Sequence, residues 1–122
     1  RIPKGSRVLY HAAAVMTANL TMALADLAEE TWTRSGAPRG AALRALVPLM
    51  RGAVDNLERV GLPRALTGPV VRGDAAVVTR QLRALKGDAR KIYRLLSARL
   101  LESSTGLTKP SRTAMKKALG AR

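Results

Sequence analysis

The two side chains best suited to act beside a reducible C=O group, His11 and Asn19, lie in one stretch without formal charge, residues 8–25. In an α-helix, residues eight apart lie about 12 Å apart along the axis and about 80° apart around it, so one broad face can carry both. An imidazole can donate a proton near neutral pH, and a carboxamide can hold a carboxylate or carbonyl. The alternative is that both are satisfied interior polar groups or packing contacts between helices, and the residues alone favour that alternative.

A second set of candidate residues, for binding an anion, lies in the loop Thr67-Gly68-Pro69-Val70-Val71-Arg72-Gly73-Asp74. Gly68 and Gly73 allow close approach of the backbone. Arg72 can clamp a carboxylate or phosphate with two donors, and Thr67 supplies a hydroxyl. A plain turn with a solvated arginine and an N-capping aspartate is the alternative, which the loop alone favours.

Several kinds of site are excluded by what the sequence lacks. It contains no Gly-x-Gly-x-x-Gly motif and no phosphate-binding loop, and one His with no Cys cannot build a His- or Cys-based metal site. Ser6 and Ser35 have no base nearby in sequence, so no nucleophilic triad is indicated. We expect the carboxylates of Glu29 and Glu30 to be solvated or paired with an arginine. The chain therefore does not encode a complete catalytic apparatus or a metal site.

These candidates depend on a long first helix, which the uncharged stretch predicts over about residues 6–33, buried on nearly every side. Ser35-Gly36 is typical of its C-terminal end. Such a helix needs more apolar partners than a small solitary domain provides. Because alanine is weakly apolar and His11, Asn19 and two threonines would lie at depth, we expect no membrane span. We expect no secretory signal either, since the stretch continues into Asp26, Glu29 and Glu30 without a loop after a cleavage site.

Helix-breaking glycines and prolines and helix-capping aspartates predict the remaining helices. Pro38 begins a helix over 38–60, kinked at Pro48, and the glycines and prolines of 61–73 exclude a helix there. Asp74 and Asp88 are expected to cap helices over 75–86 and 89–102. The expected apolar positions of the latter helix are Ile92, Leu95, Leu96, Ala98 and Leu100. The predicted fold is an all-α helical bundle, with a helical domain over 1–102 and a basic C-terminal extension over 103–122 that forms a short helix over 110–119.

The composition supports one helical domain with a strongly basic second half. The chain has 122 residues, 47% of them hydrophobic, and a formal net charge of +14. Residues 1–60 hold 8 basic and 5 acidic side chains, whereas 61–122 hold 14 and 3. Binding of nucleic acid is therefore a candidate, but the basic C-terminal segment lacks interleaved aromatic residues for stacking, and we expect a solvated tail there.

One family likeness is carried by several blocks of sequence. They are Tyr10-His11-Ala12-Ala13-Ala14-Val15, Ala18-Asn19, Leu46-x-Pro48-Leu49, Asn56-Leu57, Gly61, and Ala65-Leu66-Thr67-Gly68-Pro69-Val70-x-Arg72-Gly73-Asp74. In these blocks, over about residues 7–100, the chain resembles a bacterial family's C-terminal helical domain, long labelled a domain of unknown function. Family members join this domain to an N-terminal Rossmann-like NADP-binding domain. Their architecture is similar to that of pyrroline-5-carboxylate reductase, ketopantoate reductase and the 6-phosphogluconate dehydrogenase group.

The resemblance implies a site and a mode of assembly. In such enzymes the helical domain dimerises and closes the substrate cleft over the nicotinamide. The resemblance therefore implies a homodimer whose first helix is buried partly by a second protomer or by the Rossmann domain. It also implies that His11 is the acid, that Asn19 orients a small anionic substrate, and that Thr67, Gly68 and Arg72 hold it. The lysine found four residues before the catalytic Asn in the dehydrogenase relatives has no counterpart, because Val15 stands there.

The resulting hypothesis is a cytoplasmic, homodimeric C-terminal dimerisation and substrate-binding domain of a Rossmann-type NADP-dependent oxidoreductase. Its substrate is a small 2-oxo or imino acid, in the manner of ketopantoate reductase. NADP binds only with an N-terminal Rossmann domain, which this chain lacks, so the chain is not catalytically complete alone. One alternative is a non-enzymatic basic helical module that binds nucleic acid or an acidic protein partner. Another is an interaction domain whose catalytic partner has been lost.

Overall fold

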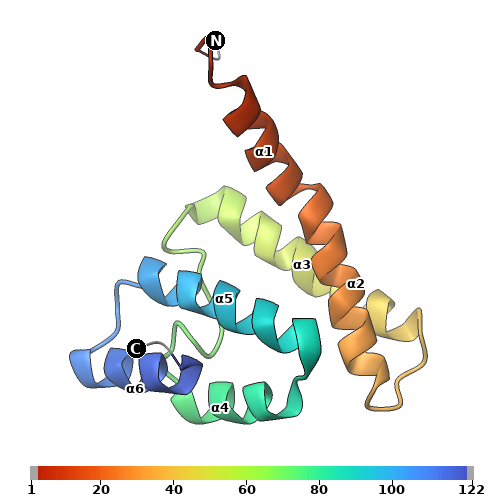
Figure 1. Cartoon of the computed structure of the whole chain (residues 1–122), viewed down its shortest axis with the longest axis vertical. Coiled ribbons are helices and arrows are strands. Elements are labelled where there is room, and N and C mark those ends of the chain that lie inside the picture. The colour runs from red at the N-terminus through yellow and green to blue at the C-terminus, as the bar shows by residue number, and fades with distance from the viewer. Residues whose placement is uncertain (1–2, 121–122) are drawn as a thin grey trace. The chain divides into compact units, whose positions relative to one another are not determined.

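The computed structural model describes residues 3–120, and within this range the chain forms helices and no strand (Figure 1). The predicted all-α fold is confirmed. The chain divides into two compact units, Arg1–Pro48 and Leu49–Arg122, and the boundary falls inside a helix. The helices are α1 (Arg7–Thr17), α2 (Asn19–Thr33), α3 (Ala41–Val60), α4 (Ala75–Ala84), α5 (Gly87–Ser103) and α6 (Lys109–Leu119).

The long first helix is confirmed, with one irregularity. Only Ala18 separates α1 from α2, and its amide still donates to the carbonyl of Ala14 at 2.9 Å. The hydroxyls of Thr17 and Thr21 each donate to the carbonyl four residues earlier, both at 2.7 Å. Because such side-chain bonds to the preceding turn bend helices, we attribute the irregularity to these two threonines, which flank it.

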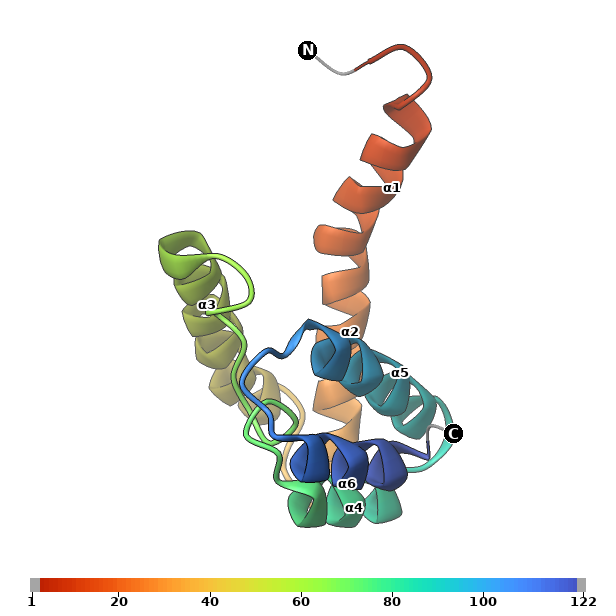
Figure 2. The ribbon, with the colours of Figure 1, turned by 90° about the vertical axis from the view of Figure 1, so that its left-hand side faces the viewer.

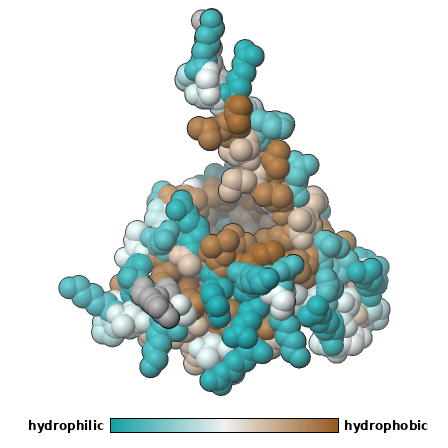
Figure 3. Space-filling view, in the orientation of Figure 1, coloured by the Kyte–Doolittle hydropathy of each residue, from teal (hydrophilic) through white to brown (hydrophobic). Residues whose placement is uncertain are grey.

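The same two helices contain no residue that is buried within this chain. Leu9 is 74% exposed and Met16 is 65% exposed. In Figure 3, brown and tan apolar residues lie along the helical segment that rises toward the top, below the hydrophilic residues at its tip. The described residues of the first unit therefore do not supply the burial that the sequence predicts for this helix.

Length and apolar composition would allow one helical segment among the described residues, Arg7–Thr33, to cross a membrane. Core helices of soluble proteins and N-terminal signal sequences have the same composition. This finding is weak evidence by itself, and the absence of a membrane span stays a prediction.

The start of α3 differs from the prediction, which placed Pro38 in its first turn. The helix begins at Ala41 because Gly40 has a φ of +76°, a left-handed conformation that cannot continue a right-handed helix. The amide of Gly40 donates instead to the Glu29 carboxylate at 2.7 Å. Glu30 forms an ion pair with Arg34 at 2.7 Å, as expected for one member of the carboxylate pair.

The second unit has a core built where α4, α5 and α6 pack against one another, and Figures 1 and 2 both show α4 and α6 side by side. Asp74 caps α4 as predicted, since its carboxylate accepts a hydrogen bond from the amide of Val77 at 3.2 Å. The buried cluster consists of Val70, Val78, Leu82, Leu101, Met115 and Leu119.

One prediction for α5 is wrong, and one is confirmed in part, because the expected apolar positions Ala98 and Leu100 do pack against the buried cluster. Asp88 is not its cap: the helix begins at Gly87, Lys86 is the N-cap residue, and Asp88 pairs with Lys91 at 3.2 Å in the first turn. Its buried positions are Ala89, Ser97 and Leu101, whereas Leu95 is 72% exposed. Small side chains on the buried face allow the helices to approach closely, and a count of apolar residues alone does not detect them.

The prediction of a solvated C-terminal tail is also wrong, although the predicted short helix is present as α6. Met115 and Leu119, one helical turn apart, are fully buried in the core of the second unit. The Thr108 hydroxyl caps the helix by accepting from the amide of Ser111 at 3.3 Å. The basic side chains of α6 therefore surround an apolar stripe that completes the core.

Candidate functional site

The polar groups of the uncharged stretch divide into two kinds. Thr17 and Thr21 satisfy their hydroxyls on their own helix and need no external partner. His11 lies on α1 and Asn19 is the first residue of α2, and both side chains are exposed. The irregularity at Ala18 lies between them, so the ideal helical angle between the two is only approximate. These two exposed groups remain the candidates for substrate chemistry in the first unit.

The predicted anion-binding loop is a compact turn in the second unit. The amide of Arg72 donates to the carbonyl of Gly68 at 3.1 Å, and that of Asp74 donates to the carbonyl of Pro69 at 2.8 Å. Val70 is buried in the core cluster and anchors the loop. The side chains of Thr67 and Arg72 are exposed. The loop therefore presents its guanidinium and hydroxyl to solvent from a fixed backbone.

Gly73 has a role that the sequence analysis missed. Its φ is +76°, and a Cβ atom at this position would lie 3.0 Å from Leu107 Cδ2 and 3.2 Å from Ser111 Cβ. Gly73 was expected to allow a bound anion close to the backbone, whereas the space beside it is taken by Leu107, just before α6, and by Ser111 of α6. The C-terminal segment therefore supports the loop that carries Arg72, and nothing in the local sequence indicates this contact.

Asn56, near the end of α3, fixes the start of the same loop. Its amide nitrogen donates to the carbonyl of Ala65 at 3.2 Å, and its amide oxygen accepts from Arg59 at 2.7 Å. Asparagine has a low propensity for the interior of a helix, because its side chain bonds to nearby backbone groups. Its presence in the predicted helix is therefore the signal that could have indicated a contact with another segment.

Arg112, which the sequence analysis placed in a solvated tail, holds α5 and α6 together. Its guanidinium donates to the carbonyl of Leu101 at 2.7 Å and to that of Ser104. Both carbonyls lie at the C-terminal end of α5, where a cation is favoured by the helix dipole. This charge is therefore not available for a distant anionic partner.

Burial shifts the pKa of one tyrosine in the second unit. Desolvation raises the pKa of the Tyr93 phenol above 10.0, and a hydrogen bond with Ser97 opposes this effect. The Tyr93 hydroxyl also donates to the side-chain oxygen of Gln81 at 2.5 Å, which links α5 to α4. The Tyr93 hydroxyl therefore joins two helices of the core unit and keeps its proton to higher pH than a solvated phenol.

The described elements differ from those that an NADP site of the Rossmann type needs. An NADP site of the Rossmann type needs a strand, a glycine-rich turn and a helix in succession, and residues 3–120 contain no strand. Within the same range no group of three His, Asp or Glu side chains could hold a metal ion. The described residues of this chain therefore do not fit a Rossmann-type NADP site.

Comparison with known proteins identifies the family. A family model described as a domain of unknown function (DUF2520) matches residues 1–100, and the chain belongs to this family. Neither a curated protein nor a solved structure matches the chain. The family match ends inside α5, so α6 lies beyond it.

Proposed function

From its membership of the DUF2520 family, we propose that this chain is the C-terminal dimerisation and substrate-binding domain of a Rossmann-type NADP-dependent oxidoreductase. The proposed substrate is a small 2-oxo or imino acid, as for ketopantoate reductase. The motifs that resemble such enzymes lie inside the matched residues, and the helical fold agrees with their C-terminal domains.

The observation that carries the proposal is the uncovered apolar surface of α1 and α2. Large apolar side chains are exposed along both helices, whereas soluble monomers rarely leave a long continuous apolar surface in water. A second protomer or a Rossmann domain would cover this surface. The exposed large apolar residues are Val8, Leu9, Tyr10, Met16, Leu20, Met22, Leu24 and Trp32.

In the proposed enzyme each candidate side chain has a chemical role. The Arg72 guanidinium binds the substrate carboxylate with two parallel hydrogen bonds, and Thr67 adds its hydroxyl. The turn at Gly68 keeps the backbone close to the bound anion. Asn19 orients the reducible group, and His11 gives a proton to its oxygen or nitrogen. The hydride would come from NADPH held by an N-terminal Rossmann domain, and no described residue of this chain is assigned to that cofactor.

Dimerisation is tested on the whole chain by sedimentation velocity at micromolar concentration. We expect twice the protomer mass, and we expect Leu20→Glu to give the protomer mass because it buries a charge in the contact. Ala45→Glu, an equal charge change at an exposed position of α3, is the control and should leave the dimer intact. A monomeric parent chain would contradict the proposed dimer.

The enzymatic part is tested with the protein encoded by the whole reading frame. The proposal requires a strand, a glycine-rich turn and a helix upstream of Arg1, and NADPH oxidation with 2-oxo or cyclic imino acids. Arg72→Lys should raise KM more than it lowers kcat, because lysine lacks the two-donor geometry. His11→Ala should lower kcat with an unchanged melting temperature; equal loss of folding would make His11 structural.

A second candidate function is a basic module that binds nucleic acid or an acidic protein. Residues 61–122 hold only three acidic side chains. All three are engaged within the chain: Asp74 caps α4, Asp88 pairs with Lys91, and Glu102 pairs with Arg99 at 3.4 Å. Binding of a nucleic acid would weaken steeply as salt rises, whereas an apolar dimer would persist.

A further inference from the structure

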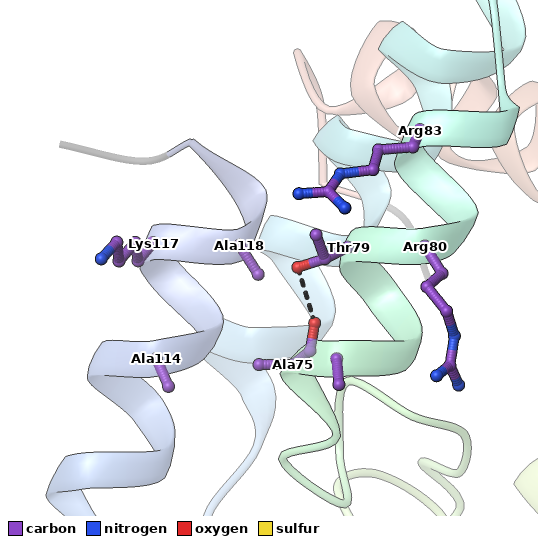
Figure 4. A pocket seen from close by; sticks show the side chains of 8 residues that line it. Ala75, Thr79, Arg80, Arg83, Ala114, Lys117 and Ala118 are labelled. Atoms are coloured by element: carbon purple, nitrogen blue, oxygen red, sulfur yellow. Dashed lines mark hydrogen bonds between the residues drawn. The ribbon is translucent and has the colours of Figure 1, made fainter.

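A groove runs between α4 and α6, inside the second unit (Figure 4). Its floor consists mainly of alanine side chains, which leave room for another backbone to approach closely. Thr79 faces it with a hydroxyl that already donates to the carbonyl of Ala75 at 2.8 Å. The groove has a volume of about 550 Å³ and is lined by Ala75, Ala76, Thr79, Arg80, Arg83, Ala114, Lys117 and Ala118.

The charge around this groove has one sign. Neither α4 nor α6 contains an acidic residue. Arg80, Arg83 and Lys117 line the groove, and none of them forms an ion pair with an acidic side chain of residues 3–120. An occupant of this groove therefore meets an apolar floor and three cations that no acidic side chain of the described residues neutralises.

The directions of the three cationic side chains favour one kind of ligand in this groove over others. Figure 4 shows Arg83 reaching toward α6, whereas Arg80 and Lys117 point away from the floor on opposite flanks. A small anion would be held by cations that converge on it. Cations on both flanks of an apolar floor instead match a rod whose apolar ridge enters the groove and whose acidic side chains lie on either side. A nucleic acid would leave the alanine floor without a complementary apolar surface.

We propose that the groove between α4 and α6 binds an acidic amphipathic α-helix of a protein partner. With 10 residues in α4 and 11 in α6, each about 15 Å long, the groove accommodates about three turns of the partner helix. Because α6 lies beyond the family match and α4 lies inside it, only part of this surface belongs to the family domain. The inference names the partner and surface for the second candidate function and does not depend on the oxidoreductase proposal.

The first test is fluorescence anisotropy with the whole chain and a labelled helical peptide of about four turns. Its leucines recur at i, i+3, i+4 and i+7, and glutamates occupy the flanking positions. A control peptide has the same composition with the leucines dispersed around the helix. We expect saturable binding of the ordered peptide and at least about tenfold weaker binding of the dispersed one, because only the first presents an apolar ridge.

Variants locate the binding on the chain. Arg80→Gln with Arg83→Gln should weaken binding of the ordered peptide about fivefold to tenfold, since exposed charge pairs contribute modestly each. Arg51→Gln with Arg64→Gln changes the net charge equally at exposed positions outside the groove and should change binding less than about twofold. Ala114→Gln, at an exposed helical position, fills the groove and should weaken binding about fivefold or more.

Three results would overturn the proposal. These are absence of binding by the ordered peptide at micromolar concentration, equal binding of both peptides, and equal loss with the two arginine pairs. A duplex DNA that binds more tightly and displaces the peptide would assign the surface to nucleic acid. Sedimentation of the same samples separates these outcomes from failure of the dimer proposal, since the proposed dimer contact is on α1 and α2 and the groove is between α4 and α6.

Discussion

Replacing Gly73 by alanine tests whether the C-terminal segment supports the loop that carries Arg72. Two costs add at this position. The φ of +76° is unfavourable for a residue with a Cβ atom by about 1–2 kcal/mol. The new methyl group would also lie 3.0 Å from Leu107 Cδ2 and 3.2 Å from Ser111 Cβ, and such overpacking costs about 1–3 kcal/mol. We therefore expect Gly73→Ala to lower the free energy of unfolding by about 2–5 kcal/mol.

Gly61 offers a matched control for the backbone cost. Its φ is +63°, and a Cβ atom there would meet nothing within 4 Å. Gly61→Ala should therefore cost only the conformational term of about 1–2 kcal/mol. The difference between the free energies lost in Gly73→Ala and in Gly61→Ala measures the cost of the steric contact with residues 107–111.

The assay is urea unfolding followed by far-ultraviolet circular dichroism at a fixed protein concentration, because dimerisation would make stability concentration-dependent. In a Leu107→Ala background, part of the cost of Gly73→Ala should be recovered relative to the Leu107→Ala variant alone, since the atom nearest to the new methyl group is absent. Equal destabilisation by Gly73→Ala and Gly61→Ala, with no recovery in the double variant, would refute the packing argument.

Three further predictions concern the second unit. Arg112→Met keeps the apolar stem but leaves two carbonyls at the end of α5 without their cation, and should cost about 2 kcal/mol in the same urea experiment; Lys116→Met, at an exposed position, is its control. Asp74→Ala removes the α4 cap and should cost about 1 kcal/mol, whereas Asp74→Asn should restore most of it; equal loss in both would contradict the capping role. Because burial raises the pKa of Tyr93, the folded chain binds this proton more tightly than the unfolded chain, so stability from this group is present below pH 10.0 and is lost as the pH rises further. Thermal melts across this range should show a smaller alkaline loss for Tyr93→Phe than for the parent chain.

Features set by neighbouring residues could be predicted from the sequence. The Asp74 cap, the end of α2 at Ser35-Gly36 and the length of the first helix follow from propensity and hydrogen bonds within a few residues. The start of α3 could not be predicted in this way. Gly40 takes a left-handed conformation and bonds to Glu29, eleven residues earlier in the chain.

In both α5 and α6, residue types alone do not show which face of the helix packs against its neighbours. Apolar residues were counted without knowing how closely the helices pack, so Leu95 was assigned to the core and Ser97 was not. In α6, the many basic residues indicated a solvated helix, although Met115 and Leu119 are four residues apart, a spacing that indicates one buried face. Charge and apolar packing coexist on one short helix because the two occupy different faces.

The candidate site was predictable only in its residue types. The sequence identified His11, Asn19, Thr67, Gly68 and Arg72, and the structure assigns the first two to one compact unit and the other three to the second. Their joint action on one substrate stays a prediction. The contacts that fix the loop around Arg72 come from residues with no chemical signature of their own.

The contacts of Gly73 also bear on the domain organisation expected from the sequence. A division after residue 102 separates α4 and α5 from Met115 and Leu119, which complete their buried cluster, and from Arg112, which caps the end of α5. It also separates the loop from Leu107 and Ser111. Since a core that loses two large buried side chains loses several kcal/mol of its stability, about 2–5 kcal/mol for each, α6 is an integral part of the second unit's fold. Any function of the Arg72 loop in this chain therefore depends on a helix that lies beyond the family match.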